Sequence, residues 1–382
     1  MDSFLYQQNS GYFAQVAENL EGEAAAELAG LGATRLNQTH RGVYFSAAEH
    51  QTLYRIVYQT RLCSRILAPL LHFDCHSSKY LYRTAGKIPW ERLLNPEQSF
   101  MINARVSGSR ISHSQYAALR LKDAIVDHFQ QRSGRRPGID KHQPDLVIDL
   151  HIRRNRAVIS LDLAGGSLHR RGYRQVSVEA PIQETLAAAM IDFAGWDGAK
   201  KLVDPCCGSG TLLAEALMRQ SMIPAGYLRD HFGLQQLPDF EPESWQQSKE
   251  EAKRGIIAPP PGLLAGSDLS KKAIRAARRN LALLPHGDRV TLKVCPLQEL
   301  APLNNAVIVA NPPYGVRLGD KAAAAALIGE LGSFLKHHCT GSTACLYFGD
   351  RQLLKAIGLK PSAKKNLNNG GLEGVLARYE LY

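Results

Sequence analysis

The sequence has no run approaching about 20 uninterrupted apolar residues, so we expect no transmembrane helix. Its N-terminus lacks a basic segment followed by an apolar one, so we also expect no signal peptide, no membrane association and a cytoplasmic location. Cysteine is sparse, with seven scattered residues and no Cys-x-x-Cys pair. This pattern argues against a disulfide framework or a zinc site and predicts reduced thiols and no bound metal.

The glycine-rich sequence from Asp204 to Thr211 lacks the features of the common nucleotide loops. No lysine follows its second glycine, as in a Walker A loop, and it does not continue as Gly-x-Gly-x-x-Gly. ATP and NAD are therefore disfavoured as ligands. What is present is a turn in which Gly208 and Gly210 let a ligand approach the backbone, followed by a helix whose free N–H groups favour an anion.

The chain is long and basic. At 382 residues it exceeds one ordinary core, so we expect two or three domains. The net charge is +11, and residues 101–175 hold fourteen Lys or Arg against six Asp or Glu, counted along the sequence. Clustered positive charge of this kind indicates a nucleic-acid partner.

The pattern of the chain changes near residues 165–175. Before this point, Leu146–Ile152 and Ala157–Leu163 alternate around an arginine-rich tip, which predicts a β-hairpin. Beyond it, strands alternate with helices, as in a doubly wound parallel sheet, interrupted by an insertion of little periodicity at 221–260. The expected strands are Lys201–Asp204, Leu263–Asp268, Val290–Val294, Ala306–Ala310, Ala344–Phe348 and Ala377–Tyr382, and the expected helices are Thr211–Arg219, Lys271–Asn280 and Lys321–His338.

The apolar run Ala306–Ala310 continues directly into Asn311-Pro312-Pro313-Tyr314. Two prolines cannot continue a sheet, because neither has an N–H to donate, so a stiff loop follows the strand. Open α/β sheets bind ligands at this end of their strands. An asparagine that accepts from an amine and a tyrosine that stacks on a ring would together hold a flat, amine-bearing group.

Asp268 closes the second strand of the predicted sheet. Its carboxylate can accept hydrogen bonds from ribose hydroxyls, as in dinucleotide folds, and it is also placed to cap the helix Lys271–Asn280. The glycine turn, Asp268 and Asn311 follow the first, second and fourth strands. Jointly they predict a nucleoside-containing cofactor across the first two strands and a planar amine at the fourth.

These loops resemble those of S-adenosylmethionine-dependent amino-methyltransferases. Ala180–Ala188 is similar to the segment before the first strand in the THUMP-containing guanine-N2-methyltransferases, His169–Arg174 resembles their linker, and Ser114–Tyr116 with Lys122–Asp127 resembles their THUMP helix. The resemblance covers nearly the whole chain and is greatest to the RlmL-like branch, which methylates a guanine amine of large-subunit ribosomal RNA.

The resemblance implies an α/β fold with S-adenosylmethionine as cofactor and RNA, 23S rRNA or a large-subunit precursor, as partner. A Rossmann-like methyltransferase with a mostly parallel seven-stranded sheet would follow an α/β THUMP RNA-binding region whose N-terminal part is ferredoxin-like. The implied domains are a ferredoxin-like part at 1–45, a THUMP domain at 46–164, a basic linker at 165–178 and the methyltransferase at 179–382.

The resemblance also implies roles for individual residues. Asn311 and the Pro312 carbonyl would accept from the target amine beside Pro313, and Tyr314 would stack on the base. The implied cofactor residues are Thr185, Asp204, Cys206, Gly208, Ser209, Gly210, Thr211, Asp268, Leu269, Gln298 and Asn311. The RNA-binding residues that we expect are Arg110, Arg153, Arg154, Arg156, Arg171, Tyr173 and Arg174.

Two points qualify this assignment. No cysteine nucleophile is needed, so we interpret Cys206 and Cys207 as small packing residues. Pro296 stands where many relatives carry an Asp that binds the adenine amine, which leaves adenine to backbone groups, Gln298 or Leu269. The alternatives are a transfer-RNA guanine, an adenine N6 or glutamine amide target, and an RNA-binding assembly protein whose methyltransferase fold has lost activity.

Overall fold

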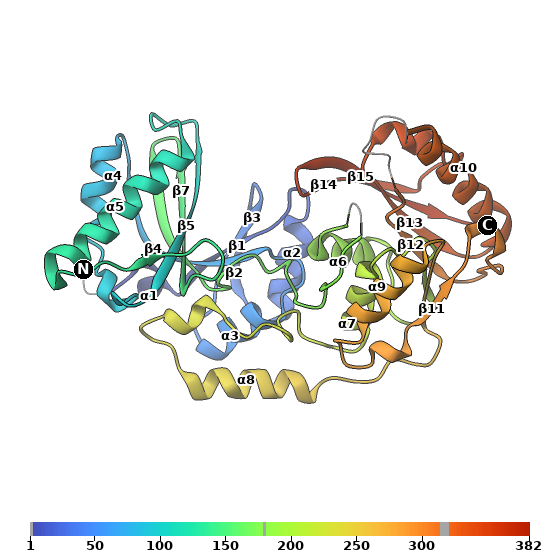
Figure 1. Ribbon diagram of the computed structural model, residues 1–382, viewed down its shortest axis with the longest axis horizontal. Helices are drawn as coiled ribbons and strands as arrows, with labels where there is room; N and C mark the ends of the chain where they lie inside the picture. Colours follow the sequence, from blue (N-terminus) through green and yellow to red (C-terminus); the bar gives the residue numbers. More distant parts are fainter. Residues whose placement is uncertain (1–2, 179–180, 314–320) are drawn as a thin grey trace. The chain divides into compact units, whose positions relative to one another are not determined.

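The computed structural model describes residues 3–178, 181–313 and 321–382, and the chain divides into two compact units (Figure 1). The first contains Met1–Val16, Glu21–Leu168 and Arg229–Lys249; the second contains Ala17–Leu20, His169–Leu228 and Glu250–Tyr382. Neither unit is one contiguous stretch, because a segment C-terminal to the predicted linker belongs to the first unit. The predicted domain boundaries place this segment, Arg229–Lys249, in the methyltransferase domain at 179–382.

The first unit is built on a mixed sheet with the strand order β2-β3-β1-β4-β8-β7-β5-β6 in the part of the chain that is described. Its strands are β1 (Gly11–Gln15), β2 (Thr34–Thr39), β3 (Gly42–Ser46), β4 (Arg65–Asp74), β5 (Ser99–Ser107), β6 (Gly138–Ile139), β7 (Leu146–Arg153) and β8 (Arg156–Asp162). Its helices are α1 (Leu5–Asn9), α2 (Glu21–Gly30), α3 (His50–Gln59), α4 (Ser78–Ala85), α5 (Ser114–Ser133) and the greater part of α8 (Pro242–Arg254), which passes into the second unit at Glu250, with 3-10 turns η1 (Trp90–Arg92) and η2 (Gly233–Gln236).

The predicted basic hairpin is confirmed. Strands β7 and β8 pair antiparallel, with Arg153 opposite Arg156. Arg154 and Asn155 form the turn with φ of 50° and 61°, the left-handed conformation that matches the twist of a two-residue hairpin. The side chains of Arg153, Arg154 and Arg156 are exposed at this tip.

Helix α8 lies in the stretch for which we expected little periodicity. Only Trp245 and Ser248 are buried along it, so its sequence carries almost no apolar pattern. Trp245 packs edge-on against Tyr58 of α3 and against Phe232, with ring centroids 5.6 Å and 5.1 Å away. The returning segment therefore completes an aromatic core of the first unit.

The second unit contains a sheet of the order β11-β10-β9-β12-β13-β15-β14 among the described residues. Its strands are β9 (Leu202–Asp204), β10 (Leu264–Asp268), β11 (Thr291–Val294), β12 (Val307–Ala310), β13 (Thr343–Phe348), β14 (Ala363–Asn369) and β15 (Leu372–Glu380). Its helices are α6 (Glu184–Phe193), α7 (Thr211–Gln220), α9 (Lys271–Leu281) and α10 (Lys321–His338), with 3-10 turns η3 (Gly287–Arg289), η4 (Leu297–Glu299) and η5 (Arg351–Lys355). The pairings from β11 to β13 are parallel and the last two are antiparallel, which confirms the predicted mostly parallel seven-stranded sheet.

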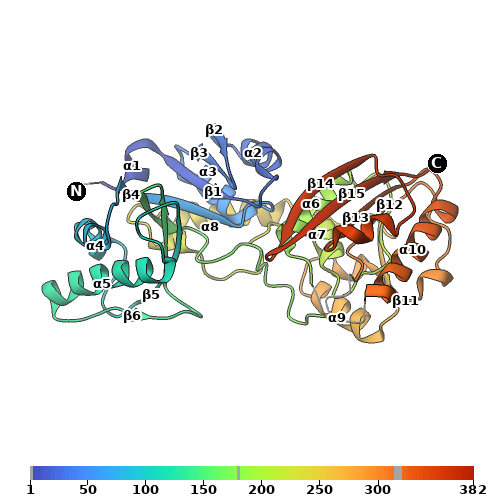
Figure 2. The ribbon, with the colours of Figure 1, turned by 90° about the horizontal axis from the view of Figure 1, so that it is seen from above.

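Helices cover both faces of this sheet (Figure 2). Alternate residues of a strand point to opposite faces. On β13, Ala344 and Leu346 share a core cluster with α10, whereas the Cys345 Sγ lies 3.6 Å from the Met190 carbonyl of α6. The unit is therefore doubly wound, as the alternation of strands and helices predicts.

The last hairpin differs from the expectation. Strand β15 begins at Leu372, not Ala377, and β14 was not predicted. Strand β14 is polar, with only Leu367 and Asn369 buried, because it is the edge of the sheet, where charged side chains reach solvent. Within the described residues, no helix is long and apolar enough to cross a membrane.

Candidate active site

The three predicted site segments meet at one edge of the second sheet. Strand β9 lies between β10 and β12, so the strand order reverses beside it. Because these strands are parallel, their carboxyl ends share one edge, and Asp204, Asp268 and Asn311 lie at or just beyond three adjacent strand ends. Such a switch point is where open α/β sheets bind ligands.

The turn between β9 and α7 depends on its glycines. Gly208 and Gly210 have φ of +53° and +84°, values that favour glycine over other residues. A Cβ on Gly210 would lie 3.1 Å from that of Ala277, so α9 packs directly against the turn. The Gly210 N–H donates to the Cys207 carbonyl at 2.8 Å, and helix α7 starts at Thr211. The turn therefore places a helix N-terminus at the sheet edge, where an anion is stabilised.

Asp268 joins two loops. Its Oδ2 accepts from the Gly208 N–H at 2.9 Å, and its Oδ1 accepts from the Ser270 N–H at 2.8 Å. The cap of α9 is Ser270, whose hydroxyl accepts from the Ala273 N–H at 3.2 Å. The additional role of Asp268 as the cap of α9 is thus wrong, and its half-buried carboxylate has remaining lone pairs for a hydroxyl group.

Asp204 is a buried carboxyl, 1% exposed, whose Oδ1 accepts from the Cys206 N–H at 3.1 Å. Burial raises its pKa to about 8; the Cys206 hydrogen bond opposes this shift and the charge of Asp268 adds to it. A nearby cation would stabilise the carboxylate form. With Asp268 and the α7 N-terminus, Asp204 gives a donor and acceptor set that fits an ammonium, a carboxylate and a ribose, the polar groups of S-adenosylmethionine.

The adjacent thiols are not prepared for nucleophilic attack. Burial raises the pKa of both Cys206 and Cys207 above the usual value, which keeps them protonated. A Cβ on Gly266 of β10 would lie 3.1 Å from that of Cys207, so this thiol fills the space between turn and strand. These contacts support the interpretation of the pair as packing residues.

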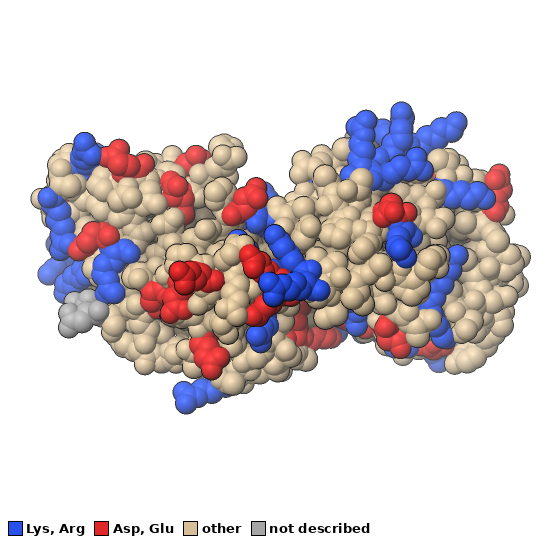
Figure 3. All heavy atoms as spheres, turned by 90° about the horizontal axis from the view of Figure 1, so that it is seen from below, with Lys and Arg blue, Asp and Glu red and all other residues tan. Residues whose placement is uncertain are grey.

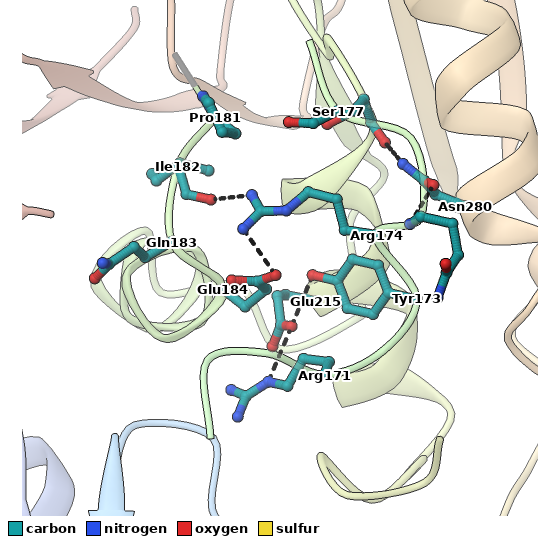
Figure 4. Close-up of polar contacts among 12 residues, drawn as sticks. Arg171, Tyr173, Arg174, Ser177, Pro181, Ile182, Gln183, Glu184, Glu215 and Asn280 are labelled. Atoms are coloured by element: carbon teal, nitrogen blue, oxygen red, sulfur yellow. Dashed lines mark hydrogen bonds and ion pairs between the residues drawn. The ribbon is translucent and has the colours of Figure 1, made fainter. Parts of the chain in front are cut away.

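Residues Arg171–Val176, here called the strap, make polar contacts with Glu184, Glu215 and Asn280 of α6, α7 and α9 (Figure 4). The Arg171 Nε donates to Glu215 Oε1 of α7 at 3.3 Å, and the Tyr173 hydroxyl donates to the same oxygen at 2.9 Å. Arg171 and Tyr173 are 1% and 0% exposed. The prediction that these two side chains bind RNA is therefore wrong: both are used inside the protein to anchor α7.

Arg174 of the strap holds the segment before α6. Its guanidinium donates to the Ile182 carbonyl at 2.8 Å and pairs with Glu184 at 2.9 Å. Burial raises the pKa of Glu184 to about 7, although Arg174 opposes the shift. Because Glu184 precedes Thr185, this contact fixes a predicted cofactor residue. The predicted contact of Arg174 with RNA remains a prediction.

Asn280, which we did not predict, connects the strap to the glycine turn (Figure 4). Its Oδ1 accepts from the N–H groups of Gln175 and Val176 at 3.1 and 3.0 Å. Its Nδ2 donates to the carbonyls of Val176 and Ser209 at 2.8 and 3.0 Å. The amide is thus fully satisfied while 1% exposed. A polar residue on the apolar face of α9 was the signal that could have revealed it.

Replacing Asn280 by aspartate tests this connection. In Asn280→Asp, the new carboxylate would still accept from the strap but would face two carbonyl oxygens without a donor, so we expect about 2 kcal/mol lower unfolding free energy at pH 7. The pKa of the new carboxyl would rise, because only its protonated form can donate. Part of the loss should therefore be recovered at pH 5, as measured by urea unfolding relative to wild type at each pH. An equal loss at both pH values would contradict the assignment.

The remaining predicted residues lie in varied settings. Thr185 is buried on α6, Ser209 is buried in the glycine turn and Thr211 is buried at the start of α7, whereas Leu269 is 74% exposed beside Asp268. Gln298 is exposed and donates to Glu330 at 2.6 Å. Asn311 is half-buried, Pro312 is buried and Pro313 is exposed, while Arg110 is exposed in the first unit. Tyr314 lies outside the described residues. Among those that are described, no group of three or more His, Cys, Asp or Glu could hold a metal ion.

Three family models match the chain. One described as an RMKL-like methyltransferase domain matches residues 171–378. A THUMP domain matches residues 75–162, and an RlmL ferredoxin-like domain matches residues 12–67.

Individual proteins are similar over nearly the full length. A Synechocystis protein with the provisional description RNA methyltransferase slr0064 is 39% identical, covering 97% of both chains. The ribosomal RNA large subunit methyltransferase K/L of Syntrophotalea carbinolica is 38% identical over 97% of this chain and 53% of its own length, so the chain spans about half of that relative. The solved structure of SMU.472, a provisionally described methyltransferase complexed with SAH, is 27% identical with a TM-score of 0.85, covering 98% of both chains.

Proposed function

Because the chain belongs to the RMKL-like methyltransferase family, we propose that it transfers a methyl group from S-adenosylmethionine to the exocyclic N2 amine of a guanine in 23S (large-subunit) rRNA. The observation that carries the proposal is the placement of Asn311-Pro312 one strand away from Asp204 and the glycine turn. An amine acceptor and a cofactor cradle thereby share one sheet edge. The relatives named as rRNA large subunit methyltransferases support the RNA substrate.

The methyl donor is S-adenosylmethionine, since the similar SMU.472 structure holds SAH, the product that this donor leaves. When bound, it supplies an electrophilic methyl group on a positively charged sulfur. Asp204 would hold its ammonium, the N–H groups from Gly208 to Thr211 its carboxylate, and Asp268 its ribose. The exposed Leu269 offers an apolar surface to adenine, in a site where Pro296 provides no carboxylate.

The hydrogen-bond acceptors that follow β12 would compensate for the poor nucleophilicity of a guanine amine. The lone pair of a guanine amine is delocalised into the ring, so the amine attacks poorly without help. Hydrogen bonds from the amine to the Asn311 amide oxygen and the Pro312 carbonyl would orient the nitrogen and favour the positive charge that develops on it. The fixed φ of Pro312 and Pro313 keeps these acceptors in place. Tyr314 would stack on the base.

The first unit would bind the RNA. It contains the THUMP match at 75–162. Arg153, Arg154 and Arg156 are exposed at the hairpin tip, and Arg110 is exposed in the loop that follows β5. The Arg110 N–H donates to Asn155 of this tip at 2.9 Å, so the loop and the tip form one basic surface. Arginines there can bind phosphates without reading base sequence. The target guanine must leave its stack to reach Asn311.

Nucleoside mass spectrometry of treated RNA tests the function. The purified chain is incubated with S-adenosylmethionine and an unmodified transcript of large-subunit rRNA, with a transfer-RNA pool and a DNA duplex as parallel substrates. We expect N2-methylguanosine in the rRNA transcript. N6-methyladenine in any substrate, methylation of transfer RNA alone, or cofactor binding without methylation would each contradict the proposal.

The raised pKa of Asp204 makes cofactor binding pH-dependent. With a pKa of about 8, the carboxyl is mostly protonated near pH 7, and an ammonium would require the carboxylate. Binding should therefore release a proton, and the Kd for SAH should fall by up to about tenfold per pH unit as the pH rises from 6 towards 8. Calorimetry in buffers of different ionisation enthalpy measures both quantities. Asp204→Asn should bind more weakly, without this slope; an unchanged slope would contradict the role.

A further inference from the structure

Helix α9 carries positive charge on one face only. Five basic side chains of this helix are exposed: Lys271, Lys272, Arg275, Arg278 and Arg279. The opposite face, which includes Ala273, Ile274 and Ala277, is buried. The helix contains no acidic residue, and none of its five basic residues forms an ion pair with another residue that the structure describes. In Figure 3, Lys and Arg side chains gather densely over the region of the second unit that α9 occupies.

This charge pattern opposes the stability of the helix. Lys271 and Arg275, and likewise Arg275 and Arg279, are four residues apart, where like charges repel. Lys271 and Lys272 also lie in the first turn, at the positive end of the helix dipole, where cations are unfavourable. Arg278 and Arg279 lie in the last turn, where cations are favourable, but the two lysines of the first turn and the repulsion between neighbouring cations have no such compensation, and a bound polyanion would relieve both.

The two faces of α9 connect this surface to the active site. On the buried face, Ala277 packs against Gly210 and Asn280 donates to the Ser209 carbonyl. The basic face lies on the other side of the same helix, about 10 Å away. An anion bound there is adjacent to the cofactor turn.

The class of ligand that would bind the basic face of α9 can be inferred from the chemistry of that face. A helix that binds a lipid surface inserts an exposed apolar face, but the apolar residues of α9 are packed inside the protein. Cations on a helix whose own apolar residues are buried fit the phosphates of a nucleic-acid backbone, which are bound by charge. We propose that the exposed face of α9 docks the RNA backbone, as a contact surface of the second unit itself. The choice of RNA over other polyanions rests on the proposed function.

Neutralising the face tests this surface. One variant replaces four of these cations by glutamine, which is uncharged and a good helix former: Lys271→Gln, Lys272→Gln, Arg275→Gln and Arg279→Gln. The control Lys200→Gln, Lys201→Gln, Lys355→Gln and Lys360→Gln removes four exposed charges from the same unit. Filter binding to the rRNA transcript is measured from 50 to 200 mM KCl, and calorimetry with SAH checks that each variant is folded.

We expect the α9 variant to bind RNA roughly tenfold more weakly or worse, with the slope of log K against log salt reduced by up to about 2.8, at 0.7 per phosphate contact. The control should stay within about twofold of wild type, and both should bind SAH normally. No loss, or an equal loss in both variants, overturns the proposal. Binding to phosphatidylserine vesicles is measured in parallel. An α9 variant that loses binding to the vesicles but not to RNA also overturns the proposal. If wild type binds RNA through α9 but methylates no guanine, the proposed function fails while this surface stands.

Discussion

Replacing Asn311 by alanine should reduce methyl transfer to RNA by at least about a hundredfold, while the Kd for SAH changes little. The expected size follows from removing one preorganised hydrogen-bond partner of the reacting group, which lowers kcat by about 10²–10³ in enzymes. Single-turnover rates with saturating RNA report the chemical step, and calorimetry reports cofactor binding. The loss should lie in kcat rather than in KM, because the acceptor orients the amine after it is bound.

Asn304→Ala is the matched control for this variant. Asn304 is an exposed asparagine just before the same strand, so its loss should leave the rate within about twofold of wild type. Asn311→Ala with a normal rate would remove Asn311 from the mechanism. A variant that also loses SAH binding would assign Asn311 to the cofactor instead of the amine.

Replacing Arg171 by methionine should lower the free energy of unfolding by about 3–5 kcal/mol, because it leaves Glu215 buried without its cation. Both side chains of this pair are fully buried. Urea unfolding measures the loss, and the exposed Arg170→Met is the control, for which we expect a change below about 1 kcal/mol. Combining Arg171→Met with Glu215→Leu should recover part of the loss, since an apolar pair needs no compensation.

The result also separates two roles for the strap. If Arg171 served RNA rather than the fold, its substitution would weaken RNA binding and leave the unfolding curve unchanged. A stability loss no larger than that of Arg170→Met would show that the Arg171–Glu215 pair is not the anchor of α7. The double variant guards against the possibility that the single one fails to fold.

The main features of the site could be predicted because they are local. Glycines with positive φ, prolines after an apolar run and an acid at a strand end all depend on a few neighbouring residues. The order of strands and helices then brings Asp204, Asp268 and Asn311 to one edge, because consecutive parallel strands end on the same side.

What could not be predicted depends on distant partners. Arg171 and Arg153 are both arginines in basic stretches, yet one is buried and the other exposed. The difference is Glu215, which lies 44 residues from Arg171 in sequence. Asn280 likewise serves the strap more than 100 residues before it. Charge and spacing reveal that such residues matter, but burial decides whether they face a ligand or the protein.

The noncontiguous first unit has a consequence for its biosynthesis. Tyr54 and Tyr58 are covered by Trp245, and the Tyr54 hydroxyl accepts from the Glu241 N–H at 2.9 Å. Residues 1–168 can therefore not close this aromatic core when they leave the ribosome. The nascent chain must wait until Arg229–Lys249 has been translated, by which time β9 and α7 of the second unit are already made. The first unit can therefore be completed only after part of the second has been translated.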